Sequence, residues 1–417
     1  MHVVISGMFR DQPTVGSGQY LHGLLEALPR VAPEHTYTLL LPAYRTDHRP
    51  PTTDHRPEAL SSVVVVRTPF EPPTTDCRPE ALSSVVSRPS SVVVVRTPFD
   101  GGNANLSKLW FEQIGAPLAA ARLGADLLHV PYFAPPLVSA VPVVVSILDI
   151  IPLLLPEYRG SIAVRAYMRL AALAARRAAW VLTLSERSRA DIVARLGIPG
   201  QRVRVTPLAA GAQYRPLDHA RAAACVAEHY GLREPFVYYV GGLDARKNVA
   251  TLLRAFGRLR RAGGPAATLA IAGRALGTDQ QLFPDLDALI AAERLEPWVR
   301  RIDVPYEDNP LLYAAATAFA YPSRYEGFGL PALEALACGT PALVADASSL
   351  PAVVGDAALR VPPDDVDGWT TALWRLLGDA ALRADLRRRG LERAARFSYE
   401  QVARDTIEVY AKVRGRG

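Results

Sequence analysis

Short apolar runs alternate with helical patterns along most of this chain of 417 residues. In the first half the strand-like runs are VVISG near the start, TYTLLL at 36–41, DLLHVP at 126–131, VPVVVSIL at 141–148 and WVLTLS at 180–185. Helical patterns such as QYLHGLLEALPRV and the Ala/Arg-rich stretch 161–179 lie between them. Strands that alternate with helices predict a parallel sheet with helices on its faces, the doubly wound α/β class.

The same rhythm restarts after a Pro- and Gly-rich stretch at 197–217. The later strand-like runs are FVYYV at 236–240, TLAIAG at 268–273, TAFAYPS at 317–323 and PALVAD at 341–346. We therefore expect two α/β units in tandem, residues 1–198 and 199–397. A last helix fills 398–417, because Ser398 and Gln401 form a capping-box pattern before an apolar helical face.

A local duplication interrupts the first unit. Residues 52–70, TTDHRPEALSSVVVVRTPF, recur at 74–99 with a short insertion. Two imperfect copies are too few for a solenoid, and their many prolines are typical of a surface connection. The sequence predicts a loop-like insert over about 43–90. Of the two VVVV runs we expect the second, 92–95, to be the strand.

Composition narrows the class of partner. A formal charge of +6 on this length does not favour nucleic acid, and it fits an anionic small ligand or an acidic membrane surface. Three scattered cysteines give no disulfide framework and favour a reducing, cytoplasmic location.

No secretory signal opens the chain, and four prolines in the uncharged run 130–148 argue against a membrane span there. The histidines show no metal-binding spacing, so we expect no metal site.

The segment 321–342, YPSRYEGFGLPALEALACGTPA, carries the strongest chemical signal. A strand runs into the glycine loop at 327–329, and Pro331 marks the start of a helix. This arrangement points free backbone N–H groups at an anion. Glu326 and Glu334 flank it, and as ionised groups they suit hydroxyl donors better than phosphate. An anion flanked by hydroxyls describes a sugar nucleotide, whereas the plain alternative is a helix with ordinary glutamates in its first turns.

Two further glycine segments follow strands. FVYYVGGLDARKNVA at 236–250 places Gly241 and Gly242 ahead of Arg246 and Lys247, with Asn248 as the expected N-cap of the next helix. Cations at the carboxyl end of a parallel strand are placed to neutralise phosphate, although an Arg-Lys pair is usually solvated surface.

GSG at 16–18 follows the first strand but lacks the GxGxxG spacing, and no acidic residue ends the second strand. A nicotinamide or flavin site is therefore not supported. A glycine-lined turn that faces a ligand across a cleft is the expected role of Gly16, Ser17 and Gly18.

SRYEGFGLPALEALACGTPALV, with YVGGLDARKN before it, resembles the family-four retaining glycosyltransferases of GT-B fold. DLLHVPYFAPP, SILDIIPLLLPEY, VLTLSERSRADI and SLPAVVGDAAL fall in the expected order, so the resemblance covers most of the chain. It implies two Rossmann-like domains, a sugar nucleotide held mainly by the second, and a last helix that crosses back to the first. It also implies transfer of a hexose without a metal and with retention at the anomeric carbon.

The resemblance also assigns roles. Glu326 would contact the donor sugar, Arg246 and Lys247 would clamp the diphosphate, and Asp149 completes the catalytic set. The remaining donor contacts would come from the backbone of the glycine segments and from a glutamate on the ribose hydroxyls: Gly241, Gly242, Phe328, Gly329, Leu330 and Glu334. Gly16, Ser17 and Gly18 would line the cleft from the acceptor side.

Three positions depart from the family pattern. Leu148 stands where many relatives have His, Ala352 where Glu is common, and Gly242 where Arg is frequent. The leading hypothesis is an enzyme that moves a mannose- or glucose-type hexose from a nucleoside-diphosphate sugar to a glycan or lipid-linked acceptor. The alternatives are a catalytically decayed sugar-nucleotide-binding protein and a GT-B-like nucleotide-sugar epimerase.

The helical stretch 161–179 raises the question of a membrane. It carries Arg165, Arg169, Arg176 and Arg177 among small apolar residues. Cationic helices of this kind dock on anionic headgroups and would hold the protein on the inner face of the membrane. A solvated helix face explains the pattern equally well.

Overall fold

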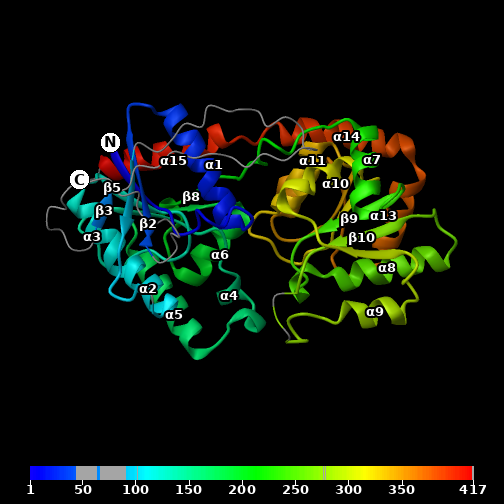
Figure 1. Ribbon diagram of the computed structural model, residues 1–417, viewed down its shortest axis with the longest axis horizontal. Coiled ribbons are helices and arrows are strands. Elements are labelled where there is room, and N and C mark those ends of the chain that lie inside the picture. The colour runs from blue at the N-terminus through cyan, green and yellow to red at the C-terminus, as the bar shows by residue number, and fades with distance from the viewer. Residues whose placement is uncertain (44–62, 66–90, 101, 276, 278, 416–417) are drawn as a thin grey trace.

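The computed structural model describes residues 1–43, 63–65, 91–100, 102–275, 277 and 279–415. Two sheets with alternating helices form two units side by side (Figure 1). This confirms the predicted α/β class. The first sheet has the order β3-β4-β2-β1-β5-β6-β7-β8 and the second the order β11-β10-β9-β12-β13-β14.

The strands of the first sheet are short and mostly buried. They are β1 (His2–Ser6), β2 (Thr36–Pro42), β3 (Val63–Val65), β4 (Ser91–Val95), β5 (Leu127–Val130), β6 (Val143–Ser146), β7 (Trp180–Thr183) and β8 (Val203–Val205). Among the described residues all of their pairings are parallel except that of β3 with β4. Near-continuous Val, Leu and Ile suit strands that helices cover on both faces.

Helices of the first unit are α1 (Gly16–Val31), α2 (Ala104–Trp110), α3 (Ala116–Arg122), α4 (Ile151–Leu154), α5 (Ile162–Arg177) and α6 (Glu186–Leu196). A π-helical segment, Phe111–Gly115, joins α2 to α3. No helix in the described ranges is long and apolar enough to cross a bilayer.

The second unit repeats the pattern. Its strands are β9 (Phe236–Val240), β10 (Thr268–Ala272), β11 (Val299–Ile302), β12 (Ala318–Tyr321), β13 (Ala342–Ala345) and β14 (Ala358–Val361). Its helices are α7 (His219–Tyr230), α8 (Val249–Arg261), α9 (Leu286–Ala292), α10 (Asn309–Ala315), α11 (Leu330–Cys338), α12 (Leu350–Val354), α13 (Val366–Gly378) and α14 (Ala380–Ala394).

Two details differ from the sequence-based expectation. The boundary expected at residue 198 falls too early, because β8 pairs in parallel with β7 and extends the first sheet to Val205. A strand of three residues has too weak a pattern to be recognised from sequence. The second VVVV run is a strand, as expected, but Val63–Val65 of the first run pairs with it as well. The rest of the predicted insert lies outside the described residues.

The last helix, α15 (Tyr399–Arg414), lies along α1 of the first unit, although α13 and α14 before it belong to the second (Figure 1). Ser398 caps it by accepting from the Gln401 backbone N–H at 3.1 Å. Gly23 on α1 leaves room for the Tyr399 ring, since a Cβ there would lie 2.1 Å from it.

A buried polar network joins α15 to the first sheet. The Tyr410 hydroxyl lies 2.7 Å from His129 Nδ1, and His129 Nε2 lies 2.8 Å from Ser146 Oγ. Ser146 also meets the Tyr20 hydroxyl of α1 at 2.9 Å. Burial lowers the pKa of His129 to about 3, so its ring is neutral and both of its nitrogens have partners. The network therefore ties α1, α15 and two central strands together.

Tyr410→Phe should lower the free energy of unfolding by about 1–3 kcal/mol, because it leaves a buried imidazole nitrogen without its partner. Urea unfolding followed by fluorescence measures this. Glu400→Gln, on the exposed side of the same helix, removes an ion pair with Arg30 and should cost less than about 0.5 kcal/mol. Equal effects of the two substitutions would contradict the importance of the network.

Candidate functional site

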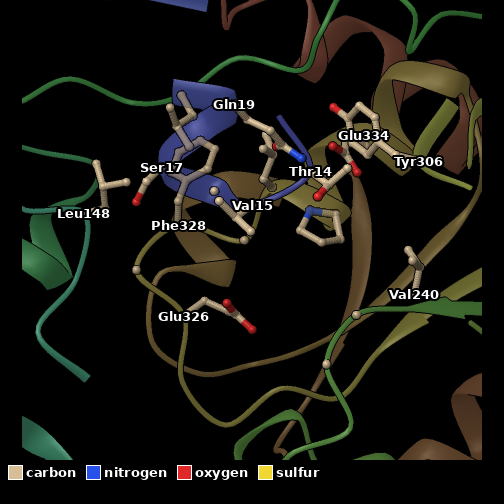
Figure 2. A pocket seen from close by; sticks show the side chains of 18 of the residues that line it. Thr14, Val15, Ser17, Gln19, Leu148, Val240, Tyr306, Glu326, Phe328 and Glu334 are labelled. Carbon is tan, nitrogen blue, oxygen red and sulfur yellow. The ribbon is translucent and has the colours of Figure 1, made fainter. Parts of the chain in front are cut away.

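A cavity of about 790 Å³ lies between the two units. Figure 2 shows Thr14, Ser17 and Leu148 reaching it from the first unit and Glu326, Phe328 and Glu334 from the second. Its second-unit wall includes Val240 and Tyr321, the last residues of β9 and β12. Ligands of doubly wound folds bind outside the carboxyl ends of strands, and this cavity is in that position.

Most of the predicted site residues line this cavity. They are Gly16, Ser17, Asp149, Gly241, Gly242, Lys247, Glu326, Phe328, Gly329, Leu330 and Glu334. The sequence order places these residues far apart, and the two sheets bring their loops to one cleft.

Gly18 and Arg246 are the exceptions. Gly18 lies in the first turn of α1, where a Cβ would come within 1.9 Å of the Gln12 carbonyl oxygen, so it permits close packing rather than lining the cleft. Arg246 lies behind Glu326 and binds it at 3.2 Å from Nη1. Adjacent residues on a 3-10 turn point in different directions, and here Lys247 alone of the pair faces the cavity.

The glycine loop between β12 and α11 is fixed from both units. Gly329 ends it with a φ of 107°, which favours glycine. Gly327 passes so close to the first unit that a Cβ would lie 2.5 Å from the Leu148 carbonyl oxygen. Serine hydroxyls donate to three successive loop carbonyls: Ser348 and Ser349 to Glu326, Ser185 and Ser188 to Gly327, and Ser349 to Phe328.

Glu326 is the centre of the charge arrangement. One carboxylate oxygen, Oε1, accepts from Lys247 Nζ at 2.7 Å and from the Tyr321 hydroxyl at 2.9 Å. Burial alone would raise the pKa of Glu326, but Lys247 and Arg246 outweigh burial and lower it to about 2. Glu326 is therefore a carboxylate at any physiological pH, held between the Lys247 ammonium and the Arg246 guanidinium.

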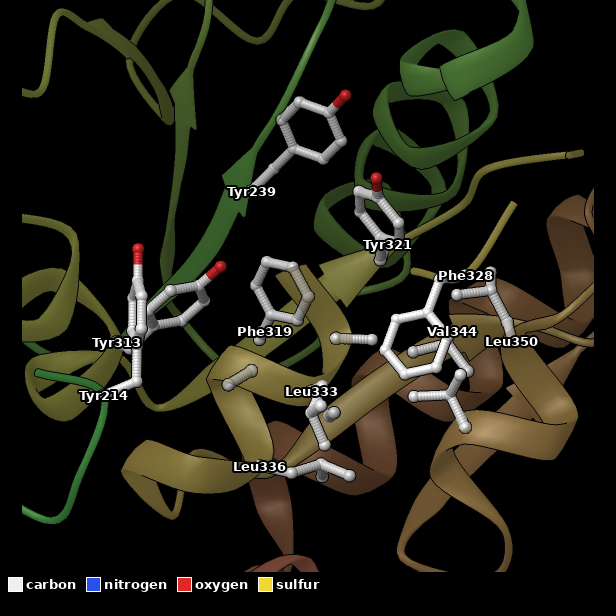
Figure 3. Close-up of a cluster of buried hydrophobic side chains, with 14 of the residues drawn as sticks. Tyr214, Tyr239, Tyr313, Phe319, Tyr321, Phe328, Leu333, Leu336, Val344 and Leu350 are labelled. Atoms are coloured by element: carbon white, nitrogen blue, oxygen red, sulfur yellow. The ribbon is translucent and has the colours of Figure 1, made fainter. Parts of the chain in front are cut away.

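The aromatic core supports this cluster. Figure 3 shows Tyr313, Phe319, Tyr321 and Tyr239 in the core under the site. Phe319 stacks on Tyr321 at 5.7 Å between ring centroids, and Tyr321 stacks on Tyr239 at 6.1 Å. The Tyr321 hydroxyl, besides donating to Glu326, accepts from Lys247 Nζ at 2.6 Å. The middle ring of this buried row therefore carries the hydroxyl that holds both charged groups.

Glu334 occupies a different environment. It lies in α11 and accepts from the Tyr313 hydroxyl at 3.2 Å. Burial raises its pKa to about 7, and hydrogen bonds from Tyr313 and Tyr214 oppose that rise only in part. The sequence predicts an ionised glutamate here, whereas burial brings the pKa of this carboxyl close to neutral pH.

The first unit contributes Asp149 to the cavity wall. Asp149 Oδ1 accepts from the Ile151 N–H at 3.1 Å, and burial raises the pKa of this carboxyl. Gly16 also lines the cavity, and no atom lies within 4 Å of the place of a Cβ there.

Tyr306, Asn309 and Tyr321 are among the lining residues that the sequence did not predict. Tyr321 ends a strand beside the glycine motif, so its position was a usable signal, but Tyr306 had none. Asn248 stands at the expected N-cap position of α8, but its side chain makes no capping hydrogen bond; it adopts φ 57° and donates to the Pro363 carbonyl oxygen. Within the described ranges no group of three or more His, Cys, Asp or Glu is arranged to hold a metal ion.

Comparison with known proteins agrees with this geometry. The family model "Glycosyltransferase Family 4" matches residues 15–209, and the model "Glycosyl transferases group 1" matches residues 228–393. O-antigen chain mannosyltransferase B from Escherichia coli is 35% identical over 231 residues, which cover 55% of this chain and 60% of that protein. D-inositol 3-phosphate glycosyltransferase from Salinispora tropica is 34% identical over 203 residues, 47% of this chain and 42% of that protein. The chain thus matches about half the length of these curated relatives.

Solved structures share the fold over the full length. Sucrose-phosphate synthase from Thermosynechococcus elongatus aligns with a TM-score of 0.69 at 19% identity and covers 100% of both chains. Anabaena HepE in complex with UDP and glucose aligns with a TM-score of 0.69 at 18% identity, covering 98% of this chain and 99% of that one. The solved structures show the fold, and because the two family models match consecutive segments that together span most of the chain, the protein belongs to glycosyltransferase family 4.

Proposed function

We propose that this chain transfers a hexosyl residue from a nucleoside-diphosphate sugar to a hydroxyl acceptor, with retention and without a metal or cofactor. The observation that carries the proposal is the buried carboxylate of Glu326 beside Lys247, at a glycine loop that leads into the N-terminus of α11. A cation, a helix N-terminus and a carboxylate in one cavity suit a diphosphate that is attached to a sugar.

Each donor group has a proposed contact. Glu326 accepts from a sugar hydroxyl with its second oxygen, while the backbone of Phe328, Gly329 and Leu330 holds the sugar and phosphate. Lys247 stabilises the diphosphate as it leaves. Glu334 accepts from the ribose hydroxyls, and Gly241 and Gly242 let the diphosphate approach β9.

The first unit supplies the acceptor side in this proposal. Gly16 and Ser17 line the cleft at the start of α1, and Asp149 lies across from the glycine loop. Arg246 acts from behind the cavity, where it fixes Glu326 and donates to the Tyr325 carbonyl oxygen at 2.7 Å.

The alternatives have less support. Leu148, one of the three departures from the family pattern expected from sequence, lines the cavity, which motivates the hypothesis of a decayed binding protein. A decayed site has no need to keep two buried cations on one buried carboxylate, because such a cluster is costly to bury. An epimerase would alter the donor without an acceptor. Similarity to O-antigen chain mannosyltransferase B supports a mannosyl donor such as GDP-mannose, and UDP-hexoses are the second candidate donors for transfer to a glycan or lipid-linked acceptor.

Glu326→Gln should lower turnover by at least about a hundredfold while the affinity for free GDP or UDP stays within about threefold. The contact with the reacting sugar is felt mainly in the transition state, and loss of the carboxylate charge does not weaken diphosphate binding. Initial rates and calorimetry with the free nucleotides measure the two quantities.

Glu334→Ala should show the opposite signature, with free diphosphate binding weakened by about 1–3 kcal/mol. Glu296→Ala, an exposed glutamate of the second unit, is the control and should change neither quantity. If Glu326→Gln turns over like the parent protein, the proposed role of the glycine segment fails.

Binding of free GDP or UDP should tighten by roughly tenfold from pH 6 to pH 8 through Glu334 alone, because its pKa of about 7 makes the accepting carboxylate the minor form at pH 6. The nucleotide phosphate also titrates, so Glu334→Gln is the matched control and keeps only that part of the pH dependence. Identical pH profiles for the two proteins would show that Glu334 does not meet the ribose.

We further propose that α5 docks on an anionic membrane from the cytoplasmic side. Arg165, Arg169, Arg176 and Arg177 are all exposed along it. Ile162 is 77% exposed and Leu173 52% exposed on the same helix. Exposed apolar side chains among arginines suit an interface that offers both acyl chains and negative headgroups.

The double substitution Arg165→Gln and Arg169→Gln should reduce co-sedimentation with phosphatidylglycerol vesicles severalfold, since each cation near the surface contributes about 1 kcal/mol. Binding of the parent protein should fade with added salt and be absent with phosphatidylcholine. The control, Arg300→Gln with Arg301→Gln, removes the same charge from an exposed strand of the second unit. A parent protein that binds both lipids equally would refute the docking proposal.

A further inference from the structure

Tyr158 reaches across the cleft from the first unit. It ends a 3-10 turn, Pro156–Tyr158, in the same segment that carries Asp149. Its hydroxyl donates to Asp244 Oδ1 and accepts from the Arg246 backbone N–H at 3.3 Å. The Arg246 guanidinium carbon also lies 5.9 Å from the centre of the Tyr158 ring. One side chain of the first unit therefore makes three contacts with the turn that follows β9.

That turn is what holds Glu326 in place. The Arg246 guanidinium binds Glu326 Oε1 at 3.2 Å and the Tyr325 carbonyl oxygen at 2.7 Å. The Arg246 carbonyl oxygen accepts from the Arg324 N–H at 2.8 Å. Asp244 Oδ1, which accepts from Tyr158, lies 3.5 Å from Arg246 Nε. The contact of Tyr158 is thus relayed to the carboxylate through one arginine.

Other hydrogen bonds between the units engage the glycine loop and not the turn that follows β9. Ser185 and Ser188 donate to the Gly327 carbonyl oxygen, and the Tyr325 hydroxyl donates to Asp191. These bonds hold the glycine loop itself. Among the hydrogen bonds described for the first unit, those of Tyr158 are the ones that engage Asp244 and the Arg246 backbone.

The Tyr158 hydroxyl is suited to act as a hydrogen-bond donor at every physiological pH. Burial raises its pKa to about 12, and the hydrogen bond to Asp244 adds to that rise. The phenol therefore keeps its proton at any physiological pH. Its single hydrogen goes to the carboxylate, and a lone pair accepts from the amide.

We propose that Tyr158 is a positioning residue that makes the placement of Arg246, and through it Glu326, depend on contact between the two units. The proposal rests on the proposed transferase function. When the units separate, Asp244 and the Arg246 amide lose their partner and the turn relaxes. When the units meet, the turn is braced and Glu326 takes its place beside Lys247. Assembly of the charge cluster is thereby coupled to closure of the cleft.

Tyr158→Phe keeps the ring and removes the hydroxyl. Hydrogen exchange of the Arg246 amide should then accelerate by about tenfold or more, because its acceptor is lost. With GDP-mannose or UDP-glucose as donor, kcat should fall about ten- to a hundredfold, as expected for a lost bond to a charged group. The donor KM should change by less than about threefold.

Tyr167→Phe is the matched control, because its hydroxyl donates to Glu112 at 2.9 Å within the first unit. It should leave both the exchange of the Arg246 amide and kcat unchanged. A purely structural role for Tyr158 would instead lower the thermal midpoint and leave kcat per folded molecule intact, and that outcome overturns the proposal.

A double-mutant cycle tests whether Tyr158 acts on Glu326 through Asp244. Asp244→Asn with Tyr158→Phe should lower kcat no further than the more damaging single substitution, since both act on the same turn. Additive losses overturn the route through Asp244. If the parent protein turns over neither donor, the proposed function fails for these donors, while the exchange rate of the Arg246 amide still decides whether Tyr158 braces the turn.

Discussion

The ion cluster of Glu326 with Lys247 and Arg246 is the interaction on which the rest of the site depends. Three charged side chains are buried together, and such a group is stable only when every charge has a partner of good geometry. Tyr321 supplies one such partner from the aromatic core, and the Tyr325 carbonyl oxygen supplies another. The cluster keeps a carboxylate ionised in a place where burial would otherwise protonate it. The glycine loop, the two strand ends and the first unit are arranged around that carboxylate.

Two glutamates of one segment therefore have opposite properties. Glu326 has cations within contact distance and a low pKa, whereas Glu334 has only hydroxyl partners and a pKa of about 7. In the proposed reaction Glu326 stays charged throughout turnover, whereas the protonation state of Glu334 depends on pH and on the bound donor. This separation follows from neighbours that lie in other strands and helices, and so the same residue type serves two roles.

Much of this arrangement could be predicted from the sequence, because it depends on local pattern. Strand-and-helix alternation gave the fold class, and the glycine loop with Glu326 and Glu334 gave the place of the cavity. The predictions that were wrong concern features that depend on tertiary contacts. These are the direction of Arg246 compared with Lys247, the packing role of Gly18, and the protonation of Glu334. The three-residue strand β8 was missed because its pattern is too short to recognise. Tyr158 was missed because its partners lie 86 and 88 residues further along the chain.

The central claim is that this cavity transfers a hexose with retention and without a metal. Proton nuclear magnetic resonance tests it most directly, with GDP-mannose or UDP-glucose as the α-linked donor, alkyl hexosides as acceptors, and a chelator present throughout. The account predicts a new anomeric signal of an α-linked product, and the signal should be lost in Glu326→Gln. A β-linked product, or transfer that appears only after a divalent cation is added, would contradict it.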